Sequence, residues 1–257
     1  MPIPRTVFIT GASSGIGAAL ARHYARQGAA LGLLARRAAP LAALAQELGV
    51  PAATYCADVA DAAAVRTAAA DFVARSGLPD LVIANAGIST GTSGGAAEDL
   101  ATLERILRTN VVGLAASLQP FVEPMRARGA GTLVGIASVA GFRGLPGSGA
   151  YSASKAAAIA WLESLRVELA GSGVAVVTLC PGYVDTPMTR VNRYPMPFIL
   201  APDAAARRMA RVIDARRAFA VVPWQMALVG ALLRRLPNWA YDRAFARAPR
   251  KPRNPPA

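Results

Sequence analysis

Histidine is nearly absent from this chain, since His23 is the one example in 257 residues. Gly11, Ser13 and Gly15 match the G-x-S-x-G pattern of a hydrolase nucleophile elbow, but such an enzyme needs a histidine base far downstream of its serine. Because His23 lies on the helix that this turn opens, a serine hydrolase is excluded. The lack of a second histidine also argues against histidine-ligated zinc sites and against dehydrogenases that use a histidine base. We predict no metal site, and we interpret His23 as a helix-face residue without a chemical role.

Cysteines are few, and no export signal is visible. The two cysteines, Cys56 and Cys180, both lie in apolar surroundings, which predicts buried thiols of a reducing compartment rather than a disulfide. The start of the chain, MPIPRTVFIT, lacks the basic segment and long apolar run of a secretory signal. We therefore expect a cytoplasmic protein.

Lysine contributes little to the formal charge of +13, because Lys155 and Lys251 are the only lysines among 28 basic residues. The rest is arginine, concentrated towards the end of the chain. From Ala201 onward twelve Arg or Lys stand against three Asp, a net charge of +9. Such a segment either meets phosphate groups of lipid or nucleic acid or forms a solubilising face. Among partners we expect no nucleic acid.

Apolar runs alternate with helical patterns along most of the chain, and 54% of the residues are hydrophobic. A chain of this length can form one domain, 1–257. The alternation predicts a single-domain, Rossmann-type α/β fold, a doubly wound parallel sheet of about seven strands with helices on both faces. The predicted strands are 6–10, 30–34, 52–56, 81–84, 134–137, 175–179 and 219–222. The predicted helices include 40–48, 62–75, 99–128 and 203–217, with others after the first strand and from about residue 151.

The first predicted strand runs directly into a glycine turn, residues 11–17 (GASSGIG), and a helix follows. Free backbone N–H groups and the helix dipole make such a turn an anion site, and glycine lets a pyrophosphate approach the backbone. The spacing G-x-x-x-G-x-G meets the general dinucleotide fingerprint only in part. Arg36 ends the second strand, where NAD-binding units carry an acidic residue, and this favours NADP(H) over NAD(H).

Residues 138–155 carry a hydroxyl, a phenol and an ammonium. Ser138 closes a buried strand, and Tyr151 and Lys155 lie four apart on one face of the following helix. An ammonium close to the phenol would lower the tyrosine pKa from about 10 towards working range. The same spacing also suits a solvated surface pair, so other segments are needed to decide between a catalytic pair and a surface pair. Asn110, a polar amide among apolar neighbours, is by itself typical of a core hydrogen bonder.

Together these segments resemble one family, the classical short-chain dehydrogenases/reductases, over roughly residues 6–187. The order and spacing of the matching pieces are more specific than any single motif. The matching residues are Thr10, Gly11, Gly15, Ile16 and Gly17, then Asp58 and Val59, Asn85, Ala86 and Gly87, Asn110, Ser138, Tyr151 and Lys155, and Pro181, Gly182 and Thr186. The sequence departs mildly from the family pattern at one place, where Ala84-Asn85 replaces the usual asparagine pair. The replacement weakens a sheet contact but involves no residue that takes part in the chemistry.

The resemblance implies a role for each matching residue. Tyr151 would exchange a proton with the substrate oxygen, Lys155 would lower the tyrosine pKa and bind the nicotinamide ribose, and Ser138 would polarise the carbonyl. Asn110 would hold a water in a proton relay, and Thr186 would reach the nicotinamide carboxamide. The other expected cofactor-binding residues are Gly11, Ser13, Ser14, Gly15, Ile16, Gly17, Arg36, Asp58, Val59, Asn85, Ala86, Gly87, Pro181, Gly182 and Val184.

These patterns predict an NADP(H)-dependent oxidoreductase that transfers hydride between the nicotinamide and a carbonyl or secondary alcohol. Residues 188–202, with their prolines, aromatic residues and methionines, predict a flexible apolar lid and hence a hydrophobic small-molecule substrate. We also expect a homodimer or homotetramer. The alternative is a dinucleotide-binding sensor or scaffold without turnover, which the intact Ser138, Tyr151 and Lys155 disfavour.

Residues 223–257 combine an apolar stretch, 224–236, with a basic tail. The stretch is too short to span a bilayer, which needs about 20 residues. It packs against the body or a sister subunit, or it enters the interface of a membrane from its inner face. In the membrane case, the aromatic residues would lie at headgroup level and the arginines on anionic lipid. These residues are Trp224, Trp239 and Tyr241, and Arg234, Arg235, Arg243 and Arg247.

Overall fold

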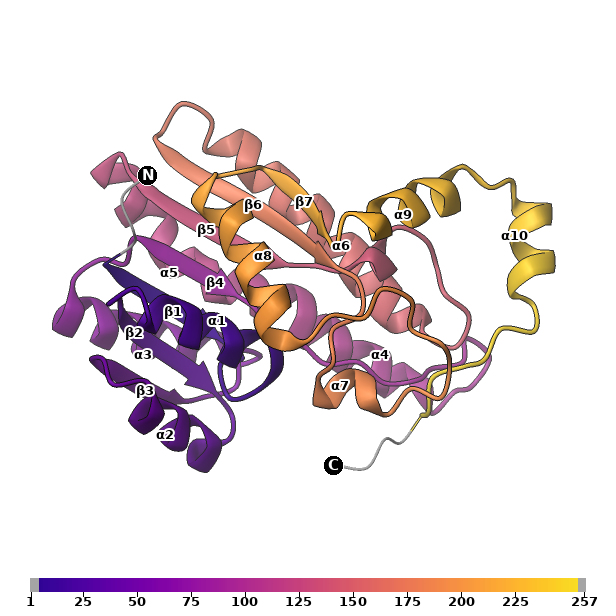
Figure 1. The fold of residues 1–257 in the computed structure, drawn as a ribbon, viewed down its shortest axis with the longest axis horizontal. Helices are drawn as coiled ribbons and strands as arrows, with labels where there is room; N and C mark the ends of the chain where they lie inside the picture. Colours follow the sequence, from indigo (N-terminus) through magenta and orange to yellow (C-terminus); the bar gives the residue numbers. More distant parts are fainter. Residues whose placement is uncertain (1–4, 254–257) are drawn as a thin grey trace.

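Seven parallel strands form one sheet at the centre of the protein, in the order β3-β2-β1-β4-β5-β6-β7 (Figure 1). A computed structural model provides this description for residues 5–253. The predicted Rossmann-type fold is confirmed, and the strands match the predicted ones closely. They are β1 (Thr6–Thr10), β2 (Ala30–Ala35), β3 (Ala52–Cys56), β4 (Leu81–Ala84), β5 (Gly131–Ile136), β6 (Val174–Pro181) and β7 (Phe219–Val222).

Helices cover both faces of the sheet. Residues of α1, α2 and α8 form one hydrophobic cluster with the sheet, and residues of α3, α5 and α6 form the other. The helices are α1 (Gly15–Ala25), α2 (Ala38–Glu47), α3 (Ala62–Ser76), α4 (Asp99–Leu107), α5 (Gly113–Arg128), α6 (Gly149–Glu168), α7 (Pro187–Arg190), α8 (Pro202–Asp214), α9 (Gln225–Arg235) and α10 (Asn238–Phe245), with a π-helical turn η1 (Arg108–Val112) and a 3-10 turn η2 (Val139–Gly141).

Strand β1 shows why the apolar runs are continuous. Val7 and Ile9 point into one cluster and Phe8 into the other, because successive side chains of a strand face opposite sides. The ring centroid of Phe8 lies 5.4 Å from that of Phe72 on α3 and 5.2 Å from that of Phe121 on α5. A central strand covered on both faces therefore needs apolar side chains at every position.

The chain changes direction across the sheet at β1. It first builds β2 and β3 on one side and then returns to place β4 against the other side of β1. Ligands of doubly wound sheets bind outside the carboxyl ends of the strands at such a reversal. The fold thus brings the segments after β1, β2, β4, β5 and β6 towards one crevice.

Two expectations about local structure are corrected. Cys180 is buried, as predicted, but Cys56 is exposed, because it ends β3, a strand at the edge of the sheet with one neighbour only. The predicted single helix over 99–128 is interrupted by η1, since its residues form a π-helical turn between α4 and α5. That turn carries Asn110, and such turns are frequent at functional sites.

Candidate active site

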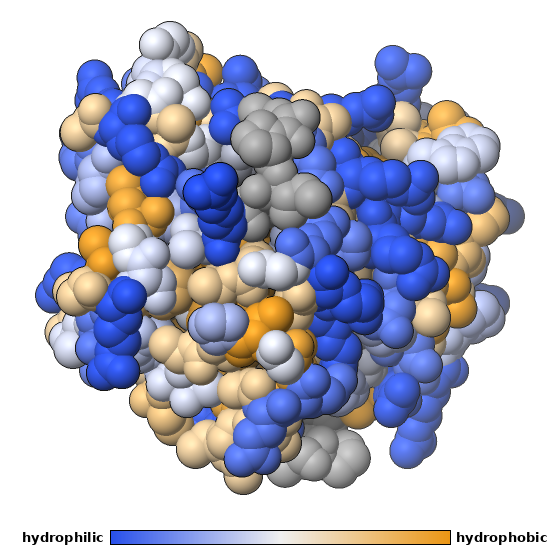
Figure 2. Space-filling model, turned by 60° about the vertical axis from the view of Figure 1, so that its left-hand side comes forward, coloured by the Kyte–Doolittle hydropathy of each residue, from blue (hydrophilic) through white to orange (hydrophobic). Residues whose placement is uncertain are grey.

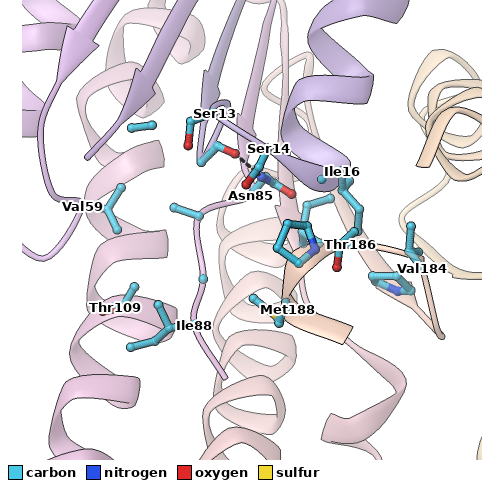
Figure 3. A pocket seen from close by; sticks show the side chains of 18 of the residues that line it. Ser13, Ser14, Ile16, Val59, Asn85, Ile88, Thr109, Val184, Thr186 and Met188 are labelled. Atoms are coloured by element: carbon cyan, nitrogen blue, oxygen red, sulfur yellow. Dashed lines mark hydrogen bonds between the residues drawn. The ribbon is translucent and has the colours of Figure 1, made fainter. Parts of the chain in front are cut away.

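A cavity of about 290 Å³ opens at the carboxyl edge of the sheet (Figure 3). The glycine turn, the ends of β2 and β3, the segment after β4, and residues 138–155, here called the catalytic segment, all contribute to its wall. The structure brings eighteen of the twenty predicted site residues to one place, because all of them except Gly17 and Asn110 line this cavity. Figure 3 shows side chains from both halves of the sheet, with Ser13 and Ser14 across from Thr186 and Met188.

Glycine is required in the turn after β1. Gly11 has a φ of +68°, in the left-handed region where side chains are strained. Gly17 lies behind it, and a Cβ at Gly17 would collide with the Gly11 carbonyl oxygen and the Asn85 side chain. The Asn85 amide donates to the carbonyl oxygens of Thr10 and Gly11, at 3.1 Å each. Gly17 therefore supports the turn from behind, and Asn85 ties the turn to the end of β4.

The start of α1 offers an anion site beside this turn. Ser14 precedes the helix with an extended backbone, and its side chain caps none of the first N–H groups. These groups have no partner within a helix. The Arg37 guanidinium donates to the hydroxyls of Ser13, at 3.3 Å, and Ser14, at 3.0 Å. Arg36 lies 3.7 Å from the Asp58 carboxylate, so both arginines stand at the same end of the cavity.

Ser138, Tyr151 and Lys155 meet at the opposite end of the cavity. Ser138 precedes η2 at the end of β5, and its hydroxyl accepts the Ala140 N–H at 3.1 Å. Tyr151 and Lys155 lie on α6, and the Lys155 ammonium is 5.7 Å from the centroid of the tyrosine ring. That ammonium donates to the carbonyl oxygen of Ile136 at 2.8 Å.

Burial dominates the protonation of these groups. It raises the pKa of Tyr151, and a hydrogen bond with the Ser138 side chain opposes the rise. Burial also lowers the pKa of Lys155 to about 8. The Lys155 ammonium donates to the Ile136 carbonyl oxygen in this structure, and its lowering of the tyrosine pKa stays a prediction. Because burial raises its pKa, the Tyr151 phenol is protonated at neutral pH.

Asn110 lies beside the site and not in its wall. Its amide donates to the Ile88 carbonyl oxygen at 2.9 Å and to the Ser154 hydroxyl at 3.0 Å, and its oxygen accepts the Ile88 N–H at 2.8 Å. These contacts join η1 to α6 and to the segment after β4. Asn110 thus behaves as the core hydrogen bonder that its apolar neighbours indicated, and its part in a proton relay stays a prediction.

Several cavity residues were not predicted as site residues. Ile88, Thr109, Ile136, Ala137, Met188 and Thr189 line the cavity. Their side chains are apolar or small, so no motif marks them. Position at the carboxyl end of a strand was an available signal, and it applies to Ile136, the last residue of β5, and to Ala137. Met188 fell within the predicted lid, residues 188–202, whose flexibility stays a prediction.

The basic end of the chain returns to the site instead of remaining in solvent, a feature that the sequence did not reveal. A C-terminal strap, residues 250–253, runs from α10 back towards α4 and α7 (Figure 1). Lys251 is buried, and its ammonium donates to the Ser89 hydroxyl at 2.9 Å and to the Met188 carbonyl oxygen at 3.2 Å. Arg253 pairs with Asp99. The strap therefore joins the segment after β4 to α7, and both contribute cavity residues. Residues 254–257 of the predicted tail lie outside the described residues.

The residues present fit a dinucleotide. Gly11 and Gly15 line the cavity, where the turn presents its backbone without side chains, a helix start offers N–H groups to phosphate, and Arg36 and Arg37 line the same cavity. Within residues 5–253, no group of three His, Cys, Asp or Glu side chains could hold a metal ion.

Comparison with known proteins agrees with this geometry. The short chain dehydrogenase family model matches residues 5–196, and the chain belongs to that family. An uncharacterised oxidoreductase of Myxococcus xanthus is 42% identical over 248 residues, which cover 95% of this chain and 97% of the relative. The chain is thus an oxidoreductase of the short-chain dehydrogenase/reductase family, as its motifs predicted.

Two solved structures bind different nicotinamide dinucleotides. A short chain dehydrogenase/reductase of Burkholderia phymatum in complex with NAD has a TM-score of 0.81 and 26% identity, covering 98% of each chain. An alcohol dehydrogenase of Thermococcus sibiricus, complexed with 5-hydroxy-NADP, has a TM-score of 0.74 and 28% identity, covering 86% of this chain and 97% of the other. The family binds nicotinamide dinucleotides, and these two relatives do not decide between NAD and NADP.

The strap generates a prediction that combines substitution with pH. Lys251→Met keeps an apolar stem but removes both ammonium hydrogen bonds. We expect the KM for the substrate to rise about tenfold at neutral pH, since a hydrogen bond from a charged group contributes roughly 1.5 kcal/mol. The cofactor dissociation constant should not change, because the strap contacts neither the glycine turn nor the arginines.

The pH dependence follows from burial, which lowers the pKa of Lys251 to about 8. The wild type loses the lysine charge as the pH rises through that value, so the difference between the two proteins should shrink above about pH 9. Arg247→Met, at an exposed position three residues before the strap, is the matched control. Equal KM values for the wild type and Lys251→Met at neutral pH would show that the strap does not position the substrate side.

Proposed function

We propose that this protein transfers hydride between NADP(H) and a carbonyl or secondary alcohol of a hydrophobic small molecule. The observation that carries the proposal is the convergence of Ser138, Tyr151 and Lys155 on the cavity that also holds the glycine turn. A sensor or scaffold needs only the cofactor-binding residues. The presence of Ser138, Tyr151 and Lys155 therefore disfavours that alternative. We also propose a homodimer or homotetramer in the cytoplasm, supported by exposed Leu100, Val112 and Val167.

The bound dinucleotide would supply or accept the hydride. In carbonyl reduction, the Tyr151 phenol donates its proton to the substrate oxygen as negative charge develops there, and the Ser138 hydroxyl donates a hydrogen bond to the same oxygen. In alcohol oxidation the proton returns to the tyrosine. Because burial raises the pKa of Tyr151, the protonated phenol is the form present at neutral pH, and it suits reduction. Lys155 adds positive charge to the site and would hold the nicotinamide ribose.

The preference for NADP(H) is supported by the two arginines at the far end of the cavity. Arg37 donates to the hydroxyls of Ser13 and Ser14, and the exposed Arg36 guanidinium lies 3.7 Å from the Asp58 carboxylate. Their guanidinium groups and the two hydroxyls would bind the additional phosphate of NADP(H). Asp58 and Val59 would flank the adenine, as the family resemblance implies.

The apolar character of the substrate is supported by apolar side chains that line the cavity. Ile88, Val184 and Met188 line the cavity (Figure 3). Phe198 and Ile199, in the segment predicted as a lid, are exposed. Apolar side chains that surround a few polar groups are typical of pockets for apolar ligands.

The activity is tested by screening NADPH oxidation with aromatic, medium-chain and steroidal carbonyls. We expect turnover with at least one class. Tyr151→Phe should lower kcat by about 100-fold or more, the usual contribution of general acid catalysis, and leave cofactor affinity unchanged. Lys155→Ala should lower both kcat and cofactor affinity. If Tyr151→Phe kept more than about a tenth of the wild-type rate, the proton-donor role would be wrong.

The cofactor preference is tested by direct titration of NADPH and NADH. Arg36→Ala and Arg37→Ala should each lower NADPH affinity by roughly ten- to hundredfold, because a hydrogen bond between charged groups contributes about 1.5–3 kcal/mol. NADH affinity should change little. Arg66→Ala, on the exposed side of α3, controls for the loss of one positive charge. Equal affinities of the wild type for the two cofactors would contradict the preference.

A further inference from the structure

The outward face of α9 carries large apolar side chains that contact no core. Trp224, which directly precedes the helix, is 65% exposed, and Leu228 and Leu232 are each 64% exposed. Residues four apart lie on the same face of a helix, so the three form a continuous stripe. The opposite face packs inwards, with Met226 against Gly182 and Gly230 against Phe142. The stripe is thus a surface feature of a helix whose other side is already packed.

Helix α10 extends this surface, and the catalytic segment holds both helices. Trp239 is 74% exposed. The Arg143 guanidinium donates to the carbonyl oxygens of Leu233 and Leu236 and lies 4.0 Å from the centroid of the Tyr241 ring. In Figure 1, α9 and α10 lie to one side of the sheet, beyond its carboxyl edge. The exposed side chains therefore belong to an ordered arm, the α9–α10 surface (residues 224–247).

One sequence expectation is corrected by this packing. The membrane alternative placed Tyr241 at headgroup level, but Tyr241 is buried against the body, and its hydroxyl donates to the Gly144 carbonyl oxygen at 2.6 Å. Its ring stacks on Phe245, with centroids 4.4 Å apart. Tyr241 thus anchors α10 to the catalytic loop, which leaves Trp224 and Trp239 as the exposed aromatic residues of the surface.

Charge distinguishes between the occupants of such a surface. Residues 224–247 contain Arg234, Arg235, Arg243 and Arg247 and one acidic residue, Asp242. A second copy of the chain, related by a two-fold axis, would bring two arginine clusters together, and like charges across an interface are costly. An anionic bilayer has the opposite charge, accepts leucine side chains, and favours tryptophan at headgroup level.

We propose that the α9–α10 surface binds the interface of anionic phospholipid membranes, with the leucine stripe inserted and Arg235, Arg243 and Arg247 on headgroups. Arg234 lies over the Phe142 ring, 5.9 Å from its centroid, and is not assigned to this contact. Within residues 5–253, no helix has the length and hydropathy to cross a bilayer, so the contact is peripheral. Phe142, Arg143 and Gly144 of the catalytic loop contact both helices. A membrane bound to this surface would lie beside the active site and could deliver an apolar substrate to it. This delivery step rests on the proposed function.

Vesicle co-sedimentation of the full chain tests the proposal. The wild type should sediment with vesicles of phosphatidylglycerol and phosphatidylcholine, less with phosphatidylcholine alone, and less at 1 M salt, where the Debye length is about 3 Å. Replacement of the stripe, L228E/L232E, should lower the partition coefficient about tenfold or more, since two inserted leucines are lost. The matched control is A42E/A43E on α2, two exposed positions that receive the same added charge.

Three results would overturn the proposal. They are wild-type protein that stays in the supernatant, equal sedimentation with both vesicle types, and L228E/L232E that sediments like the wild type. A lower solution mass for L228E/L232E by light scattering, with an unchanged circular dichroism spectrum, would also overturn it and assign the surface to contact between copies. NADPH oxidation with a water-soluble carbonyl, measured without vesicles, should be the same for L228E/L232E and wild type. This assay separates failure of the membrane contact from failure of the proposed function.

Discussion

The site depends on a buried ammonium. Lys155 is 4% exposed, and its ammonium is held by the carbonyl oxygen of Ile136 at the end of β5. Burying a positive charge is costly, which is why its pKa falls to about 8. The hydrogen bond sets the position of α6 relative to β5, and the same helix carries Tyr151. Asn110 then ties α6, through Ser154, to the segment after β4. The cavity is therefore held together by polar contacts between elements that are far apart in the sequence.

Sequence patterns predicted the fold well because a central parallel strand leaves a clear signal. Val7, Phe8 and Ile9 are buried on alternating sides, so an apolar run marks the strand without knowledge of its neighbours. Edge strands lack this constraint, and for that reason Cys56 was expected to be buried and is exposed. The site residues were predictable where backbone geometry demands one residue type, as at Gly11, or where chemistry does, as at Tyr151. Neither constraint reveals which charged group lies next to which.

Composition did not predict how the end of the chain packs. Its arginines and Lys251 predicted a solvated or phosphate-binding tail. Lys251 is instead buried against Ser89 and Met188, while Arg253 pairs with Asp99 on α4. The residues that receive these side chains lie between 63 and 162 positions earlier in the sequence. Tertiary contacts of this kind leave no local pattern. Helix α9 differs, because its apolar stripe and flanking arginines are visible in the sequence and the structure adds which face is exposed.

The central claim is that a protonated Tyr151 phenol, kept neutral by burial and contacted by Ser138, exchanges the proton of the reaction. The most direct measurement is the pH dependence of the chemical step in both directions, from single-turnover rates of the wild type and Tyr151→Phe. The account predicts that the reduction rate is constant at low pH and falls as the phenol ionises, while the oxidation rate rises through the same apparent pKa. Tyr151→Phe should lose this transition. A wild-type reduction rate that increases with pH, or a transition that persists in Tyr151→Phe, would contradict the account.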